Sequence, residues 1–248
     1  MSASFYGIEV SHPSQAARAM LDLKGIDYKP VWLLPGFQAI QLRAFGFRGR
    51  TVPAIKLDGR RVQTTRAISR ALDEAKPEPP LFPADPGQRV RVEDAERWGE
   101  QVLQPLPRQV FRWAGAHSQE VRASIAKDAG VPAPALAARV NAPVARLLSR
   151  QAEHEGDGSV KQGIARLPQR LDRVDELIAE GVIGGERPNA ADFQIASTIA
   201  SLLSFDEFIP AIENRPAAEL ARRLFPEFPG RLPAGHLPAE WLAPLGSG

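Results

Sequence analysis

The sequence predicts a small α/β domain followed by an all-helical domain. Strand-like and helix-like patterns alternate up to residue 76, four prolines then fall within residues 76–83, and apolar residues recur at helical spacing from residue 86 onward. Because a run this rich in proline forms neither a helix nor a central strand, it marks a stiff connection. We therefore assign residues 1–76 to the α/β domain, 77–85 to a proline-rich linker and 86–248 to the helical domain.

The α/β domain begins with a strand, a helix and a second strand. Residues 5–10 and 28–34 are rich in aromatic and β-branched side chains, which favour strands. Between them, apolar residues recur at helical spacing over residues 14–23, and Lys24-Gly25 supplies a basic last turn and a glycine cap. Two strands separated by a helix indicate a parallel crossover.

The second half of this domain centres on Thr51-Val52-Pro53. After an irregular or weakly helical stretch over residues 35–49, Pro53 marks the entry to a strand, because proline cannot donate to a sheet ladder. A cis Val52–Pro53 bond would leave the Val52 backbone free to pair with a small peptide ligand, whereas a trans bond would make this an ordinary strand start. Asp58-Gly59 predicts a hairpin turn, and Thr64 or Thr65 suits the N-cap of the next helix.

The helical domain is predicted from apolar spacing. Residues 90–113 form a helical run that Pro105 and Pro107 must bend or interrupt, and further helices are expected over residues 121–129, 135–151 and 160–178. Asn189 and Asp192 can form a capping box before a helix that is apolar on almost every face and therefore central. From Arg222 onward the proline-rich tail either folds back over the surface or stays partly disordered.

Composition excludes several classes of function. Lysine and arginine total 31 against 29 acidic residues, so the chain lacks the large positive charge that is typical of a nucleic-acid-binding protein. The absence of cysteine removes disulfides, thiolate metal sites and a cysteine nucleophile, and the four histidines are too scattered to predict a metal site. The sequence shows no signal peptide and no apolar run of about 18 residues, so we expect a cytoplasmic protein without a membrane span.

The order of these features resembles the glutathione transferase superfamily, in which a thioredoxin-like domain precedes an all-helical one. The resemblance covers nearly the whole chain. Three segments carry it, at spacings that match the family's first helix, its cis-proline segment and its capping box: residues 11–28, residues 51–55 and residues 189–193. The first segment is similar to the serine and cysteine classes, zeta and omega included.

The resemblance implies a role for several residues. Ser11 aligns with the serine or cysteine that activates glutathione, and its simpler interpretation is an N-cap serine; the two roles are compatible. Tyr6 is the alternative activator, because tyrosine-class enzymes carry their hydroxyl at the end of the first strand, although it also suits a core aromatic. His12, beside the site, is interpreted as a solvated loop histidine or as a group that tunes the site electrostatically.

The other residues to which the resemblance assigns glutathione binding are Thr51, Val52, Pro53, Thr64 and Thr65. Val52 would pair its backbone with the cysteinyl part of glutathione, and Thr65 preserves the hydroxyl that holds the γ-glutamyl carboxylate at a helix N-terminus. Thr51 stands where the family often has Gln or Lys. Thr64 replaces the usual Glu, which removes a charge-assisted contact to the ligand's ammonium worth about 1.5–3 kcal/mol where buried.

The resemblance therefore implies a glutathione transferase acting in detoxification, with glutathione as co-substrate, no metal and a small electrophilic apolar molecule as second substrate. Trp98, Phe111 and Trp113 are candidates to line that second pocket between the domains, or else to fill the core. A homodimer is expected, as is common in the family. The alternative is a non-catalytic thiol-binding or stress-response protein of the same fold, using glutathione or a different low-molecular-weight thiol. A thiol-dependent reductase would usually need a cysteine at position 11.

Overall fold

A computed structural model of the chain describes residues 2–128, 133–153 and 160–246. Its N-terminal part contains a four-stranded mixed sheet of strand order β2-β1-β3-β4. Strand β1 pairs in parallel with β2 and antiparallel with β3, which continues through a hairpin into β4. The strands and helices of this part are β1 (Ala3–Gly7), α1 (His12–Leu23), β2 (Tyr28–Trp32), α2 (Gln38–Ala44), β3 (Ala54–Leu57), β4 (Arg60–Gln63) and α3 (Thr65–Ala75). The predicted thioredoxin-like fold is confirmed.

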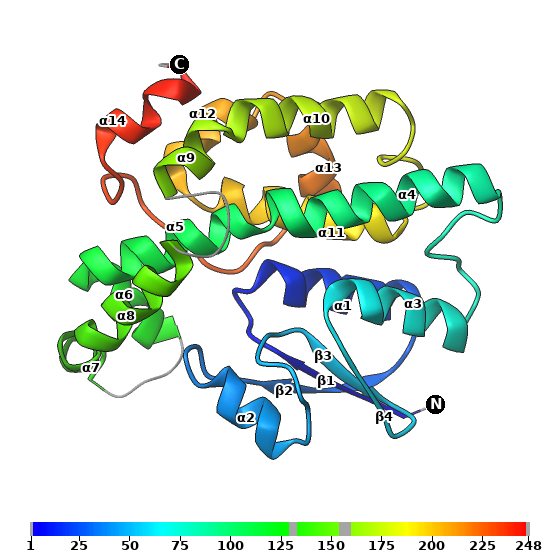
Figure 1. Cartoon of the computed structure of the whole chain (residues 1–248), viewed down its shortest axis with the longest axis horizontal. Coiled ribbons are helices and arrows are strands. Elements are labelled where there is room, and N and C mark those ends of the chain that lie inside the picture. Colours follow the sequence, from blue (N-terminus) through cyan, green and yellow to red (C-terminus); the bar gives the residue numbers. More distant parts are fainter. Residues whose placement is uncertain (1, 129–132, 154–159, 247–248) are drawn as a thin grey trace.

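Side chains alternate between the two faces of the sheet. Phe5 and Ile55 belong to the large core under α1 and α3, whereas Tyr6 and Ala54 belong to a smaller cluster that includes Leu42 of α2. Helices α1 and α3 lie between the sheet and the helical part, and α2 lies on the opposite side (Figure 1). The α1/α3 layer therefore forms the surface on which the helical part rests.

The helical part begins with one long rod that contains a π turn. Helix α4 (Pro86–Trp98) passes through η1 (Gly99–Leu103) into α5 (Pro105–His117), and the Gln104 N–H donates to the Gly99 carbonyl, five residues back, at 2.9 Å. The expected interruption near Pro105 is thus a change of helical register rather than a break. At Gly99 a Cβ would lie 2.9 Å from Ile195 Cγ1, so glycine permits the close approach of α11 (Ala190–Leu203).

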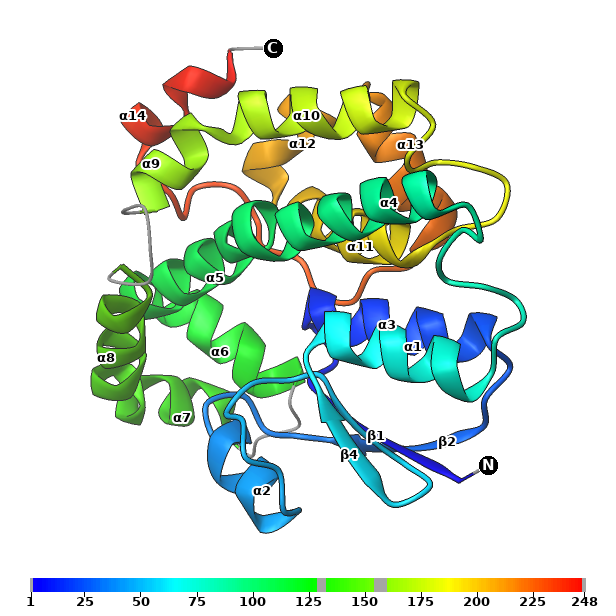
Figure 2. The same ribbon diagram turned by 45° about the vertical axis from the view of Figure 1, so that its right-hand side comes forward.

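The predicted central helix is confirmed. Every residue of α11 from Ala190 to Leu202 is buried, and the helix packs against α1, α4 and α13 (Pro216–Leu224). Its capping box is formed: Asn189 Oδ1 accepts from the Asp192 N–H at 3.2 Å, and Asp192 Oδ2 accepts from the Asn189 N–H at 2.8 Å. Figure 2 shows α11 behind α4 and above the α1/α3 layer.

Other helices differ from the predicted ones in length and number. Residues 135–151 were expected to form one helix and residues 160–178 another, but each stretch contains two, and Pro168 stands in the first turn of the second helix of the latter pair. The expected helix over residues 121–129 begins at Gln119, and Ala129 lies outside the described residues. The remaining helices are α6 (Gln119–Asp128), α7 (Pro134–Val140), α8 (Ala142–Glu153), α9 (Val160–Ala165), α10 (Leu167–Ala179), η2 (Asp206–Phe208), α12 (Ile209–Ile212), α14 (Ala239–Leu242) and η3 (Ala243–Leu245).

No helix in the described ranges is both long and apolar enough to cross a membrane. The buried side chains under α1 and α3 belong to the same connected core as those of the helical part. The exact limits of the two domains and of the linker stay predictions.

Candidate functional site

A pocket of about 700 Å³ lies where the two parts of the chain meet. One wall comes from the first part: the start of α1, the end of β2, the loop before β3 and the start of α3. The facing wall comes from η1, α5, α6, the end of α11 and the segment of residues 228–236. Six of the seven predicted site residues line it: Ser11, Thr51, Val52, Pro53, Thr64 and Thr65.

Ser11 is the N-cap residue of α1, and its hydroxyl is not used by the cap. Its backbone is extended (φ −86°, ψ 112°), its carbonyl accepts from the Gln15 N–H at 2.9 Å, and its side chain makes no capping hydrogen bond. Pro13, in the first turn, has no N–H to offer that hydroxyl. The Ser11 hydroxyl therefore faces the pocket beside the positive end of a 12-residue helix and remains available to a ligand.

Tyr6 is packed on the other face of the sheet. Its side chain is 7% exposed, and its ring centroid lies 4.9 Å from that of Phe45 and 5.0 Å from that of Phe47. Tyr6 is not among the residues that line the pocket. Of the two predicted activators, the structure brings Ser11 into the pocket and encloses Tyr6 in an aromatic cluster.

The loop before β3 presents backbone to the pocket. The Val52–Pro53 peptide bond is cis, and the Val52 N–H and C=O make no hydrogen bond within the described part of the chain. The Pro53 carbonyl accepts from the Thr64 N–H at 3.2 Å, which ties this loop to the start of α3. Thr51 is exposed at the rim. A ligand with peptide groups finds an extended, unpaired edge here.

The two threonines at the start of α3 have different environments. Thr64 is the N-cap, and its hydroxyl accepts from the Ala67 N–H at 3.3 Å. Its backbone has φ 75°, a region that β-branched residues rarely occupy. Thr65, the first residue of the helix, is 2% exposed. The Thr64 hydroxyl is thus used by the N-cap of α3. The other backbone N–H groups of the first turn of α3 remain available to a ligand in the pocket.

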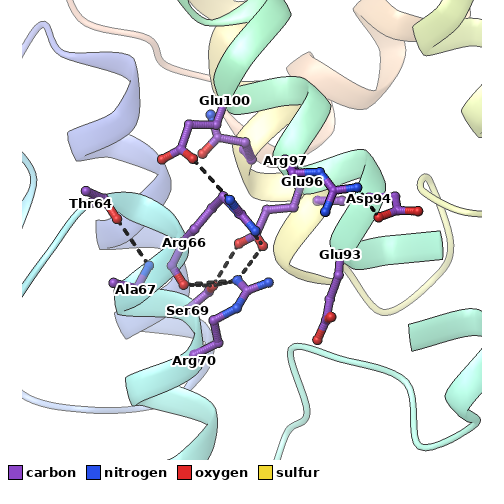
Figure 3. A network of polar contacts seen from close by, with 12 residues as sticks. Thr64, Arg66, Ala67, Ser69, Arg70, Glu93, Asp94, Glu96, Arg97 and Glu100 are labelled. Carbon is purple, nitrogen blue, oxygen red and sulfur yellow. Dashed lines mark hydrogen bonds and ion pairs between the residues drawn. The ribbon is translucent and has the colours of Figure 1, made fainter. Parts of the chain in front are cut away.

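A network of arginines and glutamates joins α3 to α4 and η1 (Figure 3). Glu96 is fully buried; it accepts from Ser69 Oγ at 2.7 Å and from Arg70 Nη1, and lies 3.6 Å from Arg66 Nε. Burial raises the pKa of the Glu96 carboxyl, against the hydrogen bonds and positive charges that favour its ionised form. Arg66 also lies 3.5 Å from Glu100, which lines the pocket.

His12 was expected foremost as a solvated loop histidine, and the structure buries it. Only 5% of the residue is exposed, although it touches the pocket. Burial lowers the pKa of His12 to about 3, and the nearby charge of Arg108 lowers it further, despite a hydrogen bond with the Gln104 backbone. The imidazole is therefore neutral at physiological pH. Its local sequence does not reveal this, because Gln104 and Arg108 belong to the helical part, more than ninety residues further along the chain.

The wall from the helical part is less aromatic than predicted. Phe111 lines the pocket, but Trp98 and Trp113 do not; both are partly buried against the core. Trp113 stacks on His117 at 4.1 Å and contacts Trp241 at 5.0 Å between ring centroids. The sequence analysis missed most of the polar residues on this wall, including Gln104 and Ser124.

The segment of residues 228–236 closes this wall. Leu232 exchanges backbone hydrogen bonds with the chain after α11, donating to the Ser204 carbonyl at 2.8 Å and accepting from the Asp206 N–H at 3.0 Å. Glu207 Oε1 accepts from three consecutive backbone N–H groups, those of residues 235–237, each at 3.0 Å. Of the two alternatives for the tail, this part folds back over the protein.

Comparison with known proteins agrees with this architecture. Residues 5–80 match the family model of the glutathione S-transferase N-terminal domain. The comparison with curated proteins gave no match. Among solved structures, the beta-etherase LigF from Sphingobium is 21% identical over 92% of this chain and 96% of its own, with a TM-score of 0.60.

Two glutathione S-transferases are similarly close. One from Rhodospirillum rubrum is 20% identical over 98% of this chain and 99% of its own, with a TM-score of 0.57. One from Methylobacterium radiotolerans, in complex with glutathione sulfonate, is 18% identical over 91% of each chain, with a TM-score of 0.54. These findings confirm the predicted fold: residues 5–80 match the glutathione S-transferase N-terminal domain, and the whole chain has the glutathione S-transferase fold.

Proposed function

We propose that this protein is a glutathione transferase in which Ser11 activates the thiol of glutathione for attack on, or isomerisation of, a small electrophilic apolar substrate. The observation that carries the proposal is the convergence of Ser11, Val52 and Thr65 on one pocket at the domain junction. The related structure that contains glutathione sulfonate supports the same ligand class.

The chemistry follows from the groups that surround the thiol. The Ser11 hydroxyl donates a hydrogen bond to the sulfur and so favours thiolate over thiol, and the N-terminus of α1 adds partial positive charge. The thiol proton passes to water, because a histidine with a pKa of about 3 does not accept it at neutral pH. The thiolate then forms the new carbon–sulfur bond, and in a substitution the leaving group departs with the electron pair.

The test measures thiol ionisation directly. Glutathione is titrated into the wild type and the Ser11→Ala variant by calorimetry, and thiolate absorbance in the ultraviolet is followed against pH. We expect binding with a lowered thiol pKa in the wild type, and binding without that lowering in Ser11→Ala. Tyr6→Phe, which keeps the packed ring, is the matched control and should behave as the wild type.

Activity with a panel of aromatic halides and Michael acceptors completes the test. Ser11→Ala should lose most of the conjugation rate. If the wild type conjugates none of these electrophiles and Ser11→Ala changes nothing, the enzymatic proposal is refuted. The non-catalytic thiol-binding alternative would then take its place; the capture of the Thr64 hydroxyl by the α3 cap is the observation that favours it.

We also propose a homodimer. Large apolar side chains are exposed around α2, including Phe37 at 60% and Ile40 at 72% exposed, and a second copy of the chain would cover them. Light scattering should give twice the 27.0 kDa mass of one chain. A monomer mass at all concentrations tested would contradict the dimer.

A further inference from the structure

Three carboxylates line the pocket in the part of the chain that the structure describes: Glu9, Glu100 and Glu120. Glu9 and Glu120 are exposed, and no ion pair of either occurs among the described residues. Glu100 differs, because its side chain is 25% exposed and Arg66, in the first turn of α3, lies 3.5 Å away. Glu100 is therefore the pocket carboxylate that pairs with an arginine in the first turn of α3.

The hydrogen bonding of Glu100 is incomplete. Its only ion pair in the described chain joins Oε2 to Arg66 Nη1, and Arg66 divides its charge between Glu100 and Glu96. Glu96, by contrast, is held at close range by Ser69 and Arg70. Figure 3 shows the Glu100 carboxylate at the edge of this network, on the side of Thr64. Its second oxygen, Oε1, has no partner among the described residues and remains open to a cation.

The position of Glu100 complements what is missing from α3. Thr64 carries no charge, and its hydroxyl already serves the helix cap, so the start of α3 offers no carboxylate to a ligand's ammonium. Glu100 offers one from η1, the π turn that replaces an ordinary helical turn between α4 and α5. Glu100, which pairs with Arg66 in the first turn of α3, thus lies within the π turn itself.

We propose that Glu100 binds the ammonium group of the γ-glutamyl end of glutathione and so replaces the acid that position 64 lacks. This inference rests on the proposed function, because it assigns a residue to the same glutathione site. It selects thiols with a free α-amino group at that end over thiols without one. An ammonium group paired with a partly buried carboxylate forms a charge-assisted hydrogen bond. Loss of such a bond typically weakens binding about ten- to hundredfold, and we expect an effect of that size on the affinity for glutathione.

The test compares two unreactive ligands by calorimetry. One is S-methylglutathione, and the other is the analogue in which glutaryl replaces γ-glutamyl, so that only the amine is absent. The wild type should bind the analogue at least about tenfold more weakly. Glu100→Gln should weaken S-methylglutathione by a similar factor and leave the analogue unchanged. Glu120→Gln removes an exposed pocket carboxylate on α6 that has no ion pair with α3 among the described residues. It is the matched control and should match the wild type with both ligands.

Each other outcome overturns the assignment. A Glu100→Gln variant that retains the wild-type preference for the amine shows that another group binds it. An equal loss of both ligands shows that Glu100 only supports the fold, and Glu100→Asp, which keeps the charge, should then restore neither the affinity nor the preference. A wild type that binds both ligands equally refutes the role of Glu100 alone, whereas a wild type that binds neither refutes the proposed function as well.

Discussion

Protonation of His12 should destabilise the protein in mild acid. The unfolded chain binds a proton at His12 below pH 6.5, but the folded protein does so only near pH 3, where burial and Arg108 set its pKa. Between these values the unfolded state holds more protons, so stability is fully present above pH 6.5 and falls as the pH is lowered. At about 1.4 kcal/mol for each pH unit, the loss reaches about 3 kcal/mol at pH 4.5 and about 4 kcal/mol at pH 3, where the folded state is itself half protonated.

The assay is urea unfolding followed by tryptophan fluorescence at pH 7 and pH 4.5. Carboxyl groups also titrate in this interval, so the informative quantity is the difference between the wild type and His12→Gln. Glutamine can still donate to the Gln104 carbonyl, but it does not titrate. We expect the wild type to lose about 3 kcal/mol more than the variant.

Equal losses in the two proteins would refute this reasoning. A second measurement does not depend on the unfolding mechanism: the ring proton resonances of His12, assigned by their absence in His12→Gln, should stay at neutral-imidazole positions down to pH 5. A resonance that titrates near pH 6.5 would show that the imidazole is solvated, and the proposed path of the thiol proton to water would need revision.

Two further changes test how the fold is held together. Lys24 is fully buried and donates to Asp73 at 2.7 Å and to the carbonyls of Lys76 and Pro77. The Lys24→Met variant should therefore lose about 3–5 kcal/mol of unfolding free energy in urea titrations. Lys29 is exposed, so the control variant Lys29→Met should lose less than about 0.5 kcal/mol. Asn189→Ala removes the acceptor for two N–H groups of α11 and should lower stability by about 1 kcal/mol in urea titrations; no change would mean that the cap is dispensable.

Local sequence signals were sufficient for much of the fold. The glycine cap after Lys24, the Asp58-Gly59 turn and the Asn189 capping box act within a few residues, and each lies where it was predicted. The parallel crossover follows from a helix between two strands. Helix interruptions were harder to predict, because the apolar stripe continues through Asn141 and Arg166 although the helix does not.

Long-range packing decided what the sequence could not predict. Gly99, the first residue of the π turn, packs closely against Ile195, almost a hundred residues away in sequence. The pKa of His12 is likewise affected by the Gln104 backbone and the charge of Arg108, both in the helical part. The motifs at the ends of strands and helices were therefore enough to predict residues that line the pocket, whereas Glu100 became a candidate only when α4 and η1 were placed against α3.

The hydrogen bonds from residues 235–237 to Glu207 have a consequence for how selectivity for a second substrate evolves in this protein. The half of the pocket proposed to hold the thiol is made of helix and strand ends that the sheet fixes, so changes there disturb the core. The opposite wall includes a crossing segment anchored at Leu232 and at one carboxylate. Insertions or exchanges between those two anchors alter the shape offered to a second substrate without repacking a helix. For a transferase of the kind proposed, recognition of the electrophile is thereby separable from activation of the thiol, and new substrates become accessible through a single loop.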